Sequence, residues 1–219
     1  MHIPDGFLSP ATWLSATAMA LPAWWWASRG LRQRLDDQTL PRLAAVTALA
    51  YSLGLVMLPL PGATSGHLSG AAILALMFGL RLSFLAFSVV LLLQALLFGA
   101  GGITAWATNV LAMGLLGAGS ALVVYRLLRR LNEDLAVALA AWVSIMVTVT
   151  VLALVLGAQP IIAARADGQP LYFPFGWSVV VPAMLVPHAL IGLAEAALTL
   201  ALWRFARARR WPGLAPAAS

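Results

Sequence analysis

The sequence predicts an all-α membrane protein with about seven transmembrane helices. Of its 219 residues, 62% are apolar and 9% are charged, and the mean hydropathy is +0.93. Soluble domains carry about 25% charged residues, so this composition excludes a water-soluble globule and a disordered chain. The apolar residues also form runs of about 20 residues, the length that an α-helix needs to cross a bilayer.

Seven apolar runs fall in or near this range of length. They cover residues 10–28, 41–58, 62–80, 82–98, 103–125, 135–157 and 178–203. Only Arg81, beside Gly79, separates the third run from the fourth, and we expect a tight turn there. Six spans with one re-entrant piece would fit almost as well. The proline- and glycine-bearing loop 158–177 should be ordered by turns and not be helical.

These runs predict a single polytopic membrane domain over residues 1–210. We expect residues 1–9 to fold back into the bundle, because the sequence Pro-Asp-Gly at 4–6 is a turn signal. Residues 211–219 contain several alanines and prolines and should form a flexible tail. No internal repeat and no linker long enough to separate two domains interrupts this pattern.

The placement of arginine predicts the orientation in the membrane. All 13 basic residues are Arg, and only Arg165 lies in a connection that follows an even-numbered run. The other twelve follow odd-numbered runs: Arg29, Arg32, Arg34, Arg42, Arg81, Arg126, Arg129, Arg130, Arg204, Arg207, Arg209 and Arg210. Because basic residues gather on the cytoplasmic side, we expect the N-terminus outside and the C-terminus in the cytoplasm. Orientation thus explains the net charge of +6 without a nucleic-acid partner.

The residue types that are absent limit the possible chemistry. The sequence contains no Lys and no Cys. Without Lys there is no P-loop lysine, so the chain cannot be its own Walker-type ATPase. Without Cys there are no disulfides, thiolate metal ligands or cysteine nucleophiles. Any metal site must therefore use nitrogen and oxygen donors.

The first residues of the chain form a candidate metal chelator. The start MHIPDGFLSP lacks the basic n-region of a cleavable signal peptide, so we expect the mature chain to begin at Met1 or His2, and the bulky His2 favours retention of Met1. The amine of Met1 and the amide and imidazole nitrogens of His2 can then form two fused chelate rings. Ni(II) and Cu(II) favour such square-planar nitrogen fields, and Co(II) is a further candidate. A disordered terminus without metal is the alternative.

A second histidine is predicted on the same side of the membrane. His67 lies in GATSGHLSG at the head of the third run. Ionisable residues at the edge of an apolar span are rare and are functional candidates, and neutral imidazole is a common metal ligand. Ser65 and Asp5 are candidates to orient a ligand imidazole, although Asp5 is most simply a turn residue. The alternative is a structural histidine that packs at a helix start.

Four segments of the chain resemble the CbiM/NikM family. They are MHIPDGFLSP at the start, TSGHL in the third run, LLLQALLFGAGG with Asn109 and Met113 beyond it, and HALIGLAEAALT near the end. Members of this family are the substrate-binding (S) components of energy-coupling-factor (ECF) ABC transporters for cobalt and nickel. The resemblance spans nearly the whole chain and implies a seven-helix fold with an inward-plugging N-terminal segment. It also implies a metal site made by Met1, His2 and His67.

This resemblance implies a transport subunit and not an enzyme. Ni(II) or Co(II) would be the bound substrate, and no cofactor is implied. The expected partners are a transmembrane coupling (T) subunit and two ATPase subunits in the bacterial cytoplasmic (inner) membrane. Some relatives carry a fused small subunit, whereas this chain stops at Ser219, so the need for a separate small membrane subunit stays open. The metal and the pathway that it serves (cobalamin biosynthesis, urease or hydrogenase) also stay open.

The last span carries two further ionisable residues. His188 and Glu195 lie on one helix face, and they are roughly 10 Å apart along the axis because each residue rises about 1.5 Å. His188 is expected nearer the outside, as a supporting group or an alternative ligand. Glu195 is expected nearer the cytoplasm, where it would pair with Arg81 or contact a partner subunit. A purely structural polar cluster is the alternative for both.

Small and amide residues are candidates for docking and packing. Ala16 and Ala20 in the first span form a small-residue stripe that could dock a partner helix. Gln94, Thr108 and Asn109 are expected to bond between helices or to steady the N-terminal segment, and Asn109 is the first choice for the second role.

A function of a different class is an intramembrane serine protease. Ser65 would be its nucleophile and His188 its base. Against this hypothesis, Ser65 lies at the edge of a span, and the N-terminal chelator would have no role. The sequence therefore favours metal transport.

Overall fold

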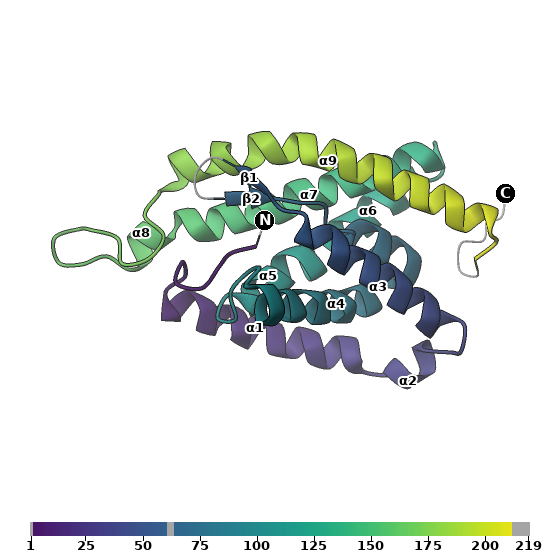
Figure 1. Ribbon diagram of the computed structural model, residues 1–219, viewed down its shortest axis with the longest axis horizontal. Coiled ribbons are helices and arrows are strands. Elements are labelled where there is room, and N and C mark those ends of the chain that lie inside the picture. Colours follow the sequence, from purple (N-terminus) through teal and green to yellow (C-terminus); the bar gives the residue numbers. More distant parts are fainter. Residues whose placement is uncertain (1, 61–63, 212–219) are drawn as a thin grey trace.

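Helices make up most of the structure. The computed structural model describes residues 2–60 and 64–211, and Figure 1 shows these as an elongated bundle. The elements are α1 (Pro10–Ser28), α2 (Leu31–Arg34), α3 (Thr39–Leu55), β1 (Leu58–Leu60), β2 (Thr64–Gly66), α4 (Ala71–Phe98), α5 (Trp106–Val110), η1 (Leu111–Gly117), α6 (Ala118–Leu128), α7 (Glu133–Gly157), α8 (Gln159–Ile162) and α9 (Trp177–Ala208). The predicted all-α class is confirmed.

Four helical stretches are long and apolar enough to cross a membrane. They are Ala71–Phe98, Trp106–Leu128, Glu133–Ile162 and Trp177–Ala208. The second of them is α5, the π-helix η1 and α6 in direct succession. α3 is a shorter apolar helix, and α1 packs beside α4 and α5. These helices make the chain a multi-pass membrane protein.

Local sequence signals determine where several helices begin and end. Ser9 caps α1 by accepting a hydrogen bond from the Thr12 N–H, and proline occupies the first position of that helix. Asn132 caps α7 by accepting from the Leu135 N–H at 2.9 Å. Gly99 ends α4 in the left-handed conformation, with φ of 62°. The predicted first and sixth runs therefore match their helices closely.

The third apolar run, residues 62–80, is not one continuous span, and this prediction is wrong. Its residues 64–66 pair with residues 58–60 in the antiparallel hairpin β1–β2, and helix begins only at Ala71. Gly79, with φ of 76° and ψ of 169°, then breaks the helix at the predicted position. The eight residues 71–78 cover about 12 Å, which is less than half of the ~30 Å hydrocarbon core. The alternative of a re-entrant piece describes this half-helix better.

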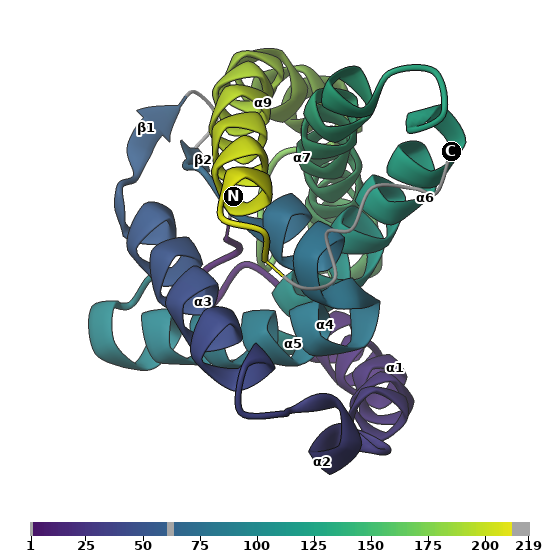
Figure 2. The ribbon, with the colours of Figure 1, turned by 90° about the vertical axis from the view of Figure 1, so that its right-hand side faces the viewer.

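Small residues let the long helices pack closely. α7 and α9 lie side by side in both views (Figures 1 and 2). Gly192 on α9 lies against the ring of Trp142, whose indole N–H donates to the Ala189 carbonyl at 3.1 Å. Gly157 at the end of α7 lies in the same way against Trp177, whose N–H donates to the Leu154 carbonyl. A side chain at either glycine would displace an indole, because small residues are what permit such close approach.

The two ends of the bundle differ in charge. Figure 1 places the α1–α3 connection, the α6–α7 connection and the end of α9 at one end, and loop 158–177 at the other. The first three segments carry most of the arginines. This distribution fits the expected orientation, which itself stays a prediction.

Loop 158–177 and the chain end differ slightly from expectation. The loop begins with the short helix α8, so the prediction that it contains no helix is wrong for this one turn. The rest is ordered by turns and by an antiparallel bridge between Ala164 and Pro170, as predicted. Trp211 packs against the core, and its backbone N–H donates to the Ala206 carbonyl. The expected tail therefore does not begin at this residue. Residues 212–219 lie outside the described residues.

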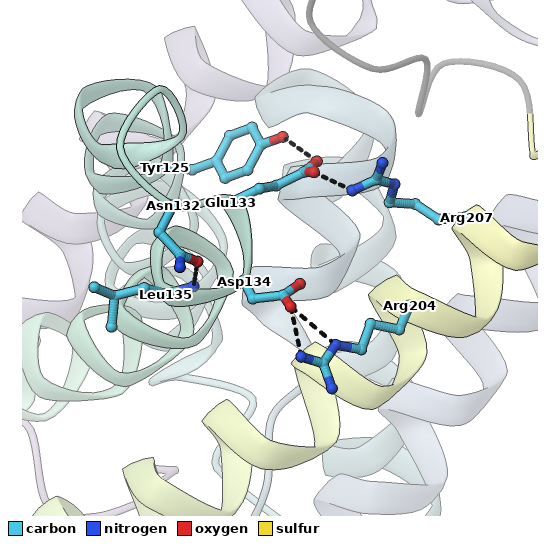
Figure 3. A network of polar contacts seen from close by, with 7 residues as sticks. All are labelled: Tyr125, Asn132, Glu133, Asp134, Leu135, Arg204 and Arg207. Atoms are coloured by element: carbon cyan, nitrogen blue, oxygen red, sulfur yellow. Dashed lines mark hydrogen bonds and ion pairs between the residues drawn. The ribbon is translucent and has the colours of Figure 1, made fainter.

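Ion pairs join α7 to α9 at the arginine-rich end (Figure 3). Arg207 pairs with Glu133, and Arg204 pairs with Asp134. The Tyr125 hydroxyl donates to Glu133 Oε1 at 3.3 Å. The Arg204 side chain is 63% exposed, so water screens this pair and its contribution to stability is small.

We expect Arg204→Ala to lower Tm by no more than about 3 °C at low ionic strength. The difference should vanish in high salt, because mobile ions screen exposed pairs. Thermal unfolding in detergent at two ionic strengths measures both effects, with Arg165→Ala in loop 158–177 as the control. A large loss of Tm that salt does not change would contradict a surface role for this pair.

Candidate metal centre

The N-terminal segment, residues 2–9, runs into the interior of the bundle. Both ribbon views place the start of this segment among the helices, close to the hairpin β1–β2 (Figures 1 and 2). Ile3 and Leu8 are almost completely buried. Phe7 packs on Phe173 of loop 158–177 with ring centroids 5.3 Å apart, and its carbonyl accepts from the Phe173 N–H. The expected inward fold is found for this part of the segment.

Asn109 binds the backbone of this segment at one residue. Its Oδ1 accepts from the Ile3 N–H at 3.0 Å, and its Nδ2 donates to the Ile3 carbonyl at 3.1 Å. The same carbonyl accepts from the Gly102 N–H at 2.9 Å. Asn109 is itself buried in α5, so it holds the residue next to His2 in a fixed place.

Asp5 fastens the segment to the loop before α5. Its carboxylate accepts from the N–H groups of Ile103 and Thr104 and from the Thr104 hydroxyl. Partial burial would raise the pKa of Asp5, but these hydrogen bonds outweigh it and lower the pKa below its usual value. Gly102 leaves the space that Asp5 occupies, because a Cβ there would collide with the Asp5 backbone and carboxylate. Asp5 therefore anchors the segment to this loop, and its carboxylate accepts these hydrogen bonds instead of one from a ligand imidazole.

Gln159 is an anchor that the sequence reasoning missed. It is fully buried at the end of α7 and the start of α8. Its Oε1 accepts from the Ser9 N–H at 2.9 Å, and its Nε2 donates to the Thr12 hydroxyl and to the Val155 carbonyl. The sequence does show an amide side chain at the end of an apolar run. Its partner Ser9 lies 150 residues away in the chain, so the sequence does not indicate what Gln159 binds.

Two histidines meet at the inner end of the segment. The ring centroids of His2 and His67 are 4.4 Å apart, with 34° between the ring planes. The Nδ1 of His67 lies 2.8 Å from the Leu68 carbonyl, so Nδ1 carries the proton and Nε2 presents a lone pair. His67 Nε2 and His2 Nδ1 are both buried without a hydrogen-bond partner in the described ranges 2–60 and 64–211.

Burial keeps both imidazoles neutral. It lowers the pKa of His2 to about 3 and that of His67 well below its usual value, because desolvation disfavours the charged form. A neutral imidazole can offer its lone pair to a metal ion. Two buried lone pairs without partners carry a desolvation penalty, which a bound cation would relieve.

Other donors at this position must come from the backbone or the chain end. The described residues contain no cluster of three or more His, Cys, Asp or Glu side chains that could hold a metal. The amide nitrogen of His2 lies in the same short segment. Met1, the third predicted ligand residue, lies outside the described residues. The side chains therefore suit a metal that accepts nitrogen donors, such as nickel or cobalt.

His188 lies close to this pair, and its ring resembles that of His67: Nδ1 lies against a backbone carbonyl, and Nε2 is buried without a close hydrogen-bond partner among the described residues. It is fully buried in α9, and its Nδ1 lies 2.7 Å from the Met184 carbonyl. Its Nε2 faces the backbone of Ser65 and Gly66. His188 thus supports the hairpin that precedes His67.

The docking role predicted for Glu195 is contradicted by its burial. Glu195 is fully buried and accepts hydrogen bonds from Ser69 and Gly70, so no partner subunit can reach its carboxylate. It does not pair with Arg81, whose guanidinium lies over the Trp26 ring at 4.8 Å. Ala20 is fully buried beside Ala107 of this same chain. Ala16 packs there too, but it lines an apolar groove between α1, η1 and α7, so docking at this residue stays a prediction.

The other polar predictions fare differently. Gln94 donates to the Tyr51 carbonyl at 2.9 Å and so bonds α4 to α3, as expected. Thr108 is buried, but its hydroxyl has no hydrogen-bond partner in the described part of the chain. The protease alternative is not supported: the Ser65 hydroxyl donates to the Met57 sulfur, while His188 faces the Ser65 backbone and not this hydroxyl.

The fold defines the class of protein: a helical membrane protein, here with two facing imidazoles inside its bundle. Comparison with known proteins gives the same class. The family model for CbiM, described as the cobalt uptake substrate-specific transmembrane region, matches residues 2–212. The chain belongs to this family of nickel and cobalt uptake proteins.

Individual relatives and a solved structure agree with this assignment. A probable fused nickel transport protein of Lactiplantibacillus plantarum is 38% identical over 94% of this chain, and a fused nickel transport protein of Rhodobacter capsulatus is 38% identical over 92%. The matched regions make up 64% and 60% of those longer proteins. A crystal structure of a transition metal transporter superposes with a TM-score of 0.92 at 33% identity, over 98% of this chain and 96% of that one.

Proposed function

We propose that this chain is the substrate-binding membrane subunit of a nickel or cobalt importer and holds one metal ion with four nitrogens. The donors are the Met1 amine, the deprotonated His2 amide, His2 Nδ1 and His67 Nε2. The observation that carries the proposal is the pair of buried, unpartnered ring nitrogens on rings 4.4 Å apart. The metal is the transported substrate and not a resident cofactor.

The chemistry of the four donors favours a square-planar site. The amine, amide and imidazole of the first two residues occupy three corners through two fused chelate rings. The fourth corner falls to His67, which comes from a different element and so closes the site only in the folded chain. Such a nitrogen field suits Ni(II) well and is also open to Co(II).

Transport requires energy that this chain cannot supply from ATP. Its sequence has no Lys and hence no P-loop lysine. We propose that two ATPase subunits and a transmembrane coupling subunit of ECF type drive the metal inward across the bacterial cytoplasmic membrane. The longer fused relatives also leave room for a small additional membrane subunit beside this chain.

The direct test is metal content and absorption of protein purified without an N-terminal tag. We expect one nickel or cobalt ion per chain, and with nickel the absorption band of a square-planar nitrogen site. A carboxy-terminal tag leaves the first amine free and is therefore the correct format. Stoichiometric binding that an added N-terminal tag leaves unchanged would contradict the proposed ligand set.

Asn109→Leu should weaken nickel binding about 10- to 100-fold, as is typical when a group that orients a ligand is lost. The reason is that both hydrogen bonds to Ile3 disappear, which frees the residue next to His2. Titration of nickel against a competing chelator measures the affinity. The matched control is Thr108→Val, since Thr108 is the buried neighbour whose hydroxyl has no partner in the described ranges. Equal affinities for the two variants would argue against Asn109 as an orienting residue.

A further inference from the structure

Glu195 is a carboxylate buried inside a membrane helix. Its side chain in α9 is fully shielded from solvent. The described part of the chain contains two ion pairs, and neither includes Glu195. A carboxylate at such a depth is expensive, and residues of this kind mark functional positions. Glu195 therefore needs an explanation beyond helix packing.

All of its hydrogen bonds go to one turn, Ser69–Gly70. Oε2 accepts from the Ser69 N–H at 2.8 Å. Oε1 accepts from the Gly70 N–H at 2.8 Å and from the Ser69 hydroxyl at 3.1 Å. Three donors from two consecutive residues converge on two oxygens, an arrangement that a carboxylate can satisfy and that a single hydroxyl or amide cannot.

This turn is the support of His67. It begins two residues after His67 and leads into the half-helix 71–78 through the Ser69 hydroxyl, which accepts from the Ala71 N–H. On its other side the turn is closely packed, because a Cβ on Gly70 would lie 3.0 Å from Ala50 of α3. The imidazole itself is tied to the backbone at Leu68. A shift of the turn must therefore move the His67 ring.

We propose that Glu195 is a positioning residue for metal binding, which acts by holding the Ser69–Gly70 turn so that His67 reaches the fourth corner of the site. This inference rests on the proposed function. Among the described residues, Glu195 bonds to Ser69 and Gly70 and to neither His2 nor His67, so its effect must pass through His67.

The test is a double-mutant cycle between Glu195→Gln and His67→Ala, with nickel(II) chloride as the probe and untagged N-termini. Glu195→Gln keeps the length of the side chain but offers one acceptor oxygen in place of two. We expect it to weaken nickel binding at least about tenfold and to shift the nickel absorption toward that of His67→Ala. In the His67→Ala background the same change should alter affinity by less than about twofold, because the coupled interaction is already gone.

Two further variants keep the proposal open to refutation. Thr199→Val is the matched control, since Thr199 lies one turn further along α9 and is equally buried, and it should leave affinity and spectrum unchanged. If Glu195→Gln does not fold, Ser69→Ala removes one of the three bonds and keeps the carboxylate. It should give a smaller loss of affinity that also disappears in the His67→Ala background.

The possible outcomes separate this inference from the proposed function. Equal losses in both backgrounds, an unchanged nickel spectrum, or an equal loss in Thr199→Val would overturn the positioning role of Glu195 and leave the metal site standing. If the wild type and His67→Ala bind nickel equally well, the proposed site itself is wrong, and the role of Glu195 with it.

Discussion

Insertion of one proline between Met1 and His2 should abolish nickel binding by the purified protein. The proline nitrogen has no proton to lose and cannot bind the metal, so the Met1 amine and the His2 amide no longer share a chelate ring and the two fused rings cannot form. The insertion also moves the terminal amine one residue further from His2, whose neighbour Ile3 is held by Asn109 and Gly102. We expect affinity to fall by more than the ~100-fold that marks the upper range for loss of a supporting group.

Calorimetric titration and the nickel absorption band measure this effect. Acetylation of the amine leaves the chain length unchanged and should have the same result, because it removes the lone pair of the amine. The matched control is one proline inserted after Gly168 in the exposed part of loop 158–177, which should bind nickel as the wild type does. Retention of the band after either N-terminal change would show that the first amine is not a ligand.

His67→Ala should convert the four-nitrogen site to a three-nitrogen site. The remaining donors lie on the N-terminal segment, which keeps its own anchors at Asn109, Asp5 and Gln159. Nickel should therefore still bind, but at least about 100-fold more weakly, and its absorption band should shift as water replaces an imidazole. Competition against a chelator, followed by spectroscopy at saturating nickel, measures both quantities.

Added imidazole offers a sharp control for the fourth corner. His67→Ala leaves a buried space next to His2, and free imidazole should enter it and restore the wild-type band. His188→Ala removes another buried histidine from the same region, but its nickel band should not respond to imidazole, because His188 is not one of the proposed donors. A spectrum of His67→Ala identical to that of the wild type would remove His67 from the ligand set.

Sequence reasoning was reliable where a property belongs to the residue or to a local run. Most of the apolar runs and the break at Gly79 were predicted, because length and hydropathy are local properties. It failed at residues 62–80, where the first half of the run contains Thr64, Ser65, His67 and Ser69 and only the second half is continuously apolar. Hydropathy alone does not distinguish a transmembrane helix from a hairpin followed by a half-helix that lies inside protein.

The candidate site shows the same division. His2 and His67 were singled out from the sequence, His2 for the chelating terminus and His67 because ionisable residues are rare at the edge of an apolar run. Gln159 was missed, and the ion pair and the partner contact expected for Glu195 are not found, because the role of a polar group in a membrane depends on its partner. Those partners lie 150 and 126 residues away in the chain, and no local pattern identifies them.

The sequence by itself determined that this chain lies in a membrane, that it contains no P-loop lysine and that no thiolate can serve as a metal ligand. These conclusions follow from composition, which does not depend on how the chain is folded. Only the tertiary structure decided that the two imidazoles face each other, and that Asn109 and Glu195 hold the segments that carry them. The physical reason is that a hydrogen bond acts over about 3 Å, so its energy is realised only when folding brings distant residues into contact.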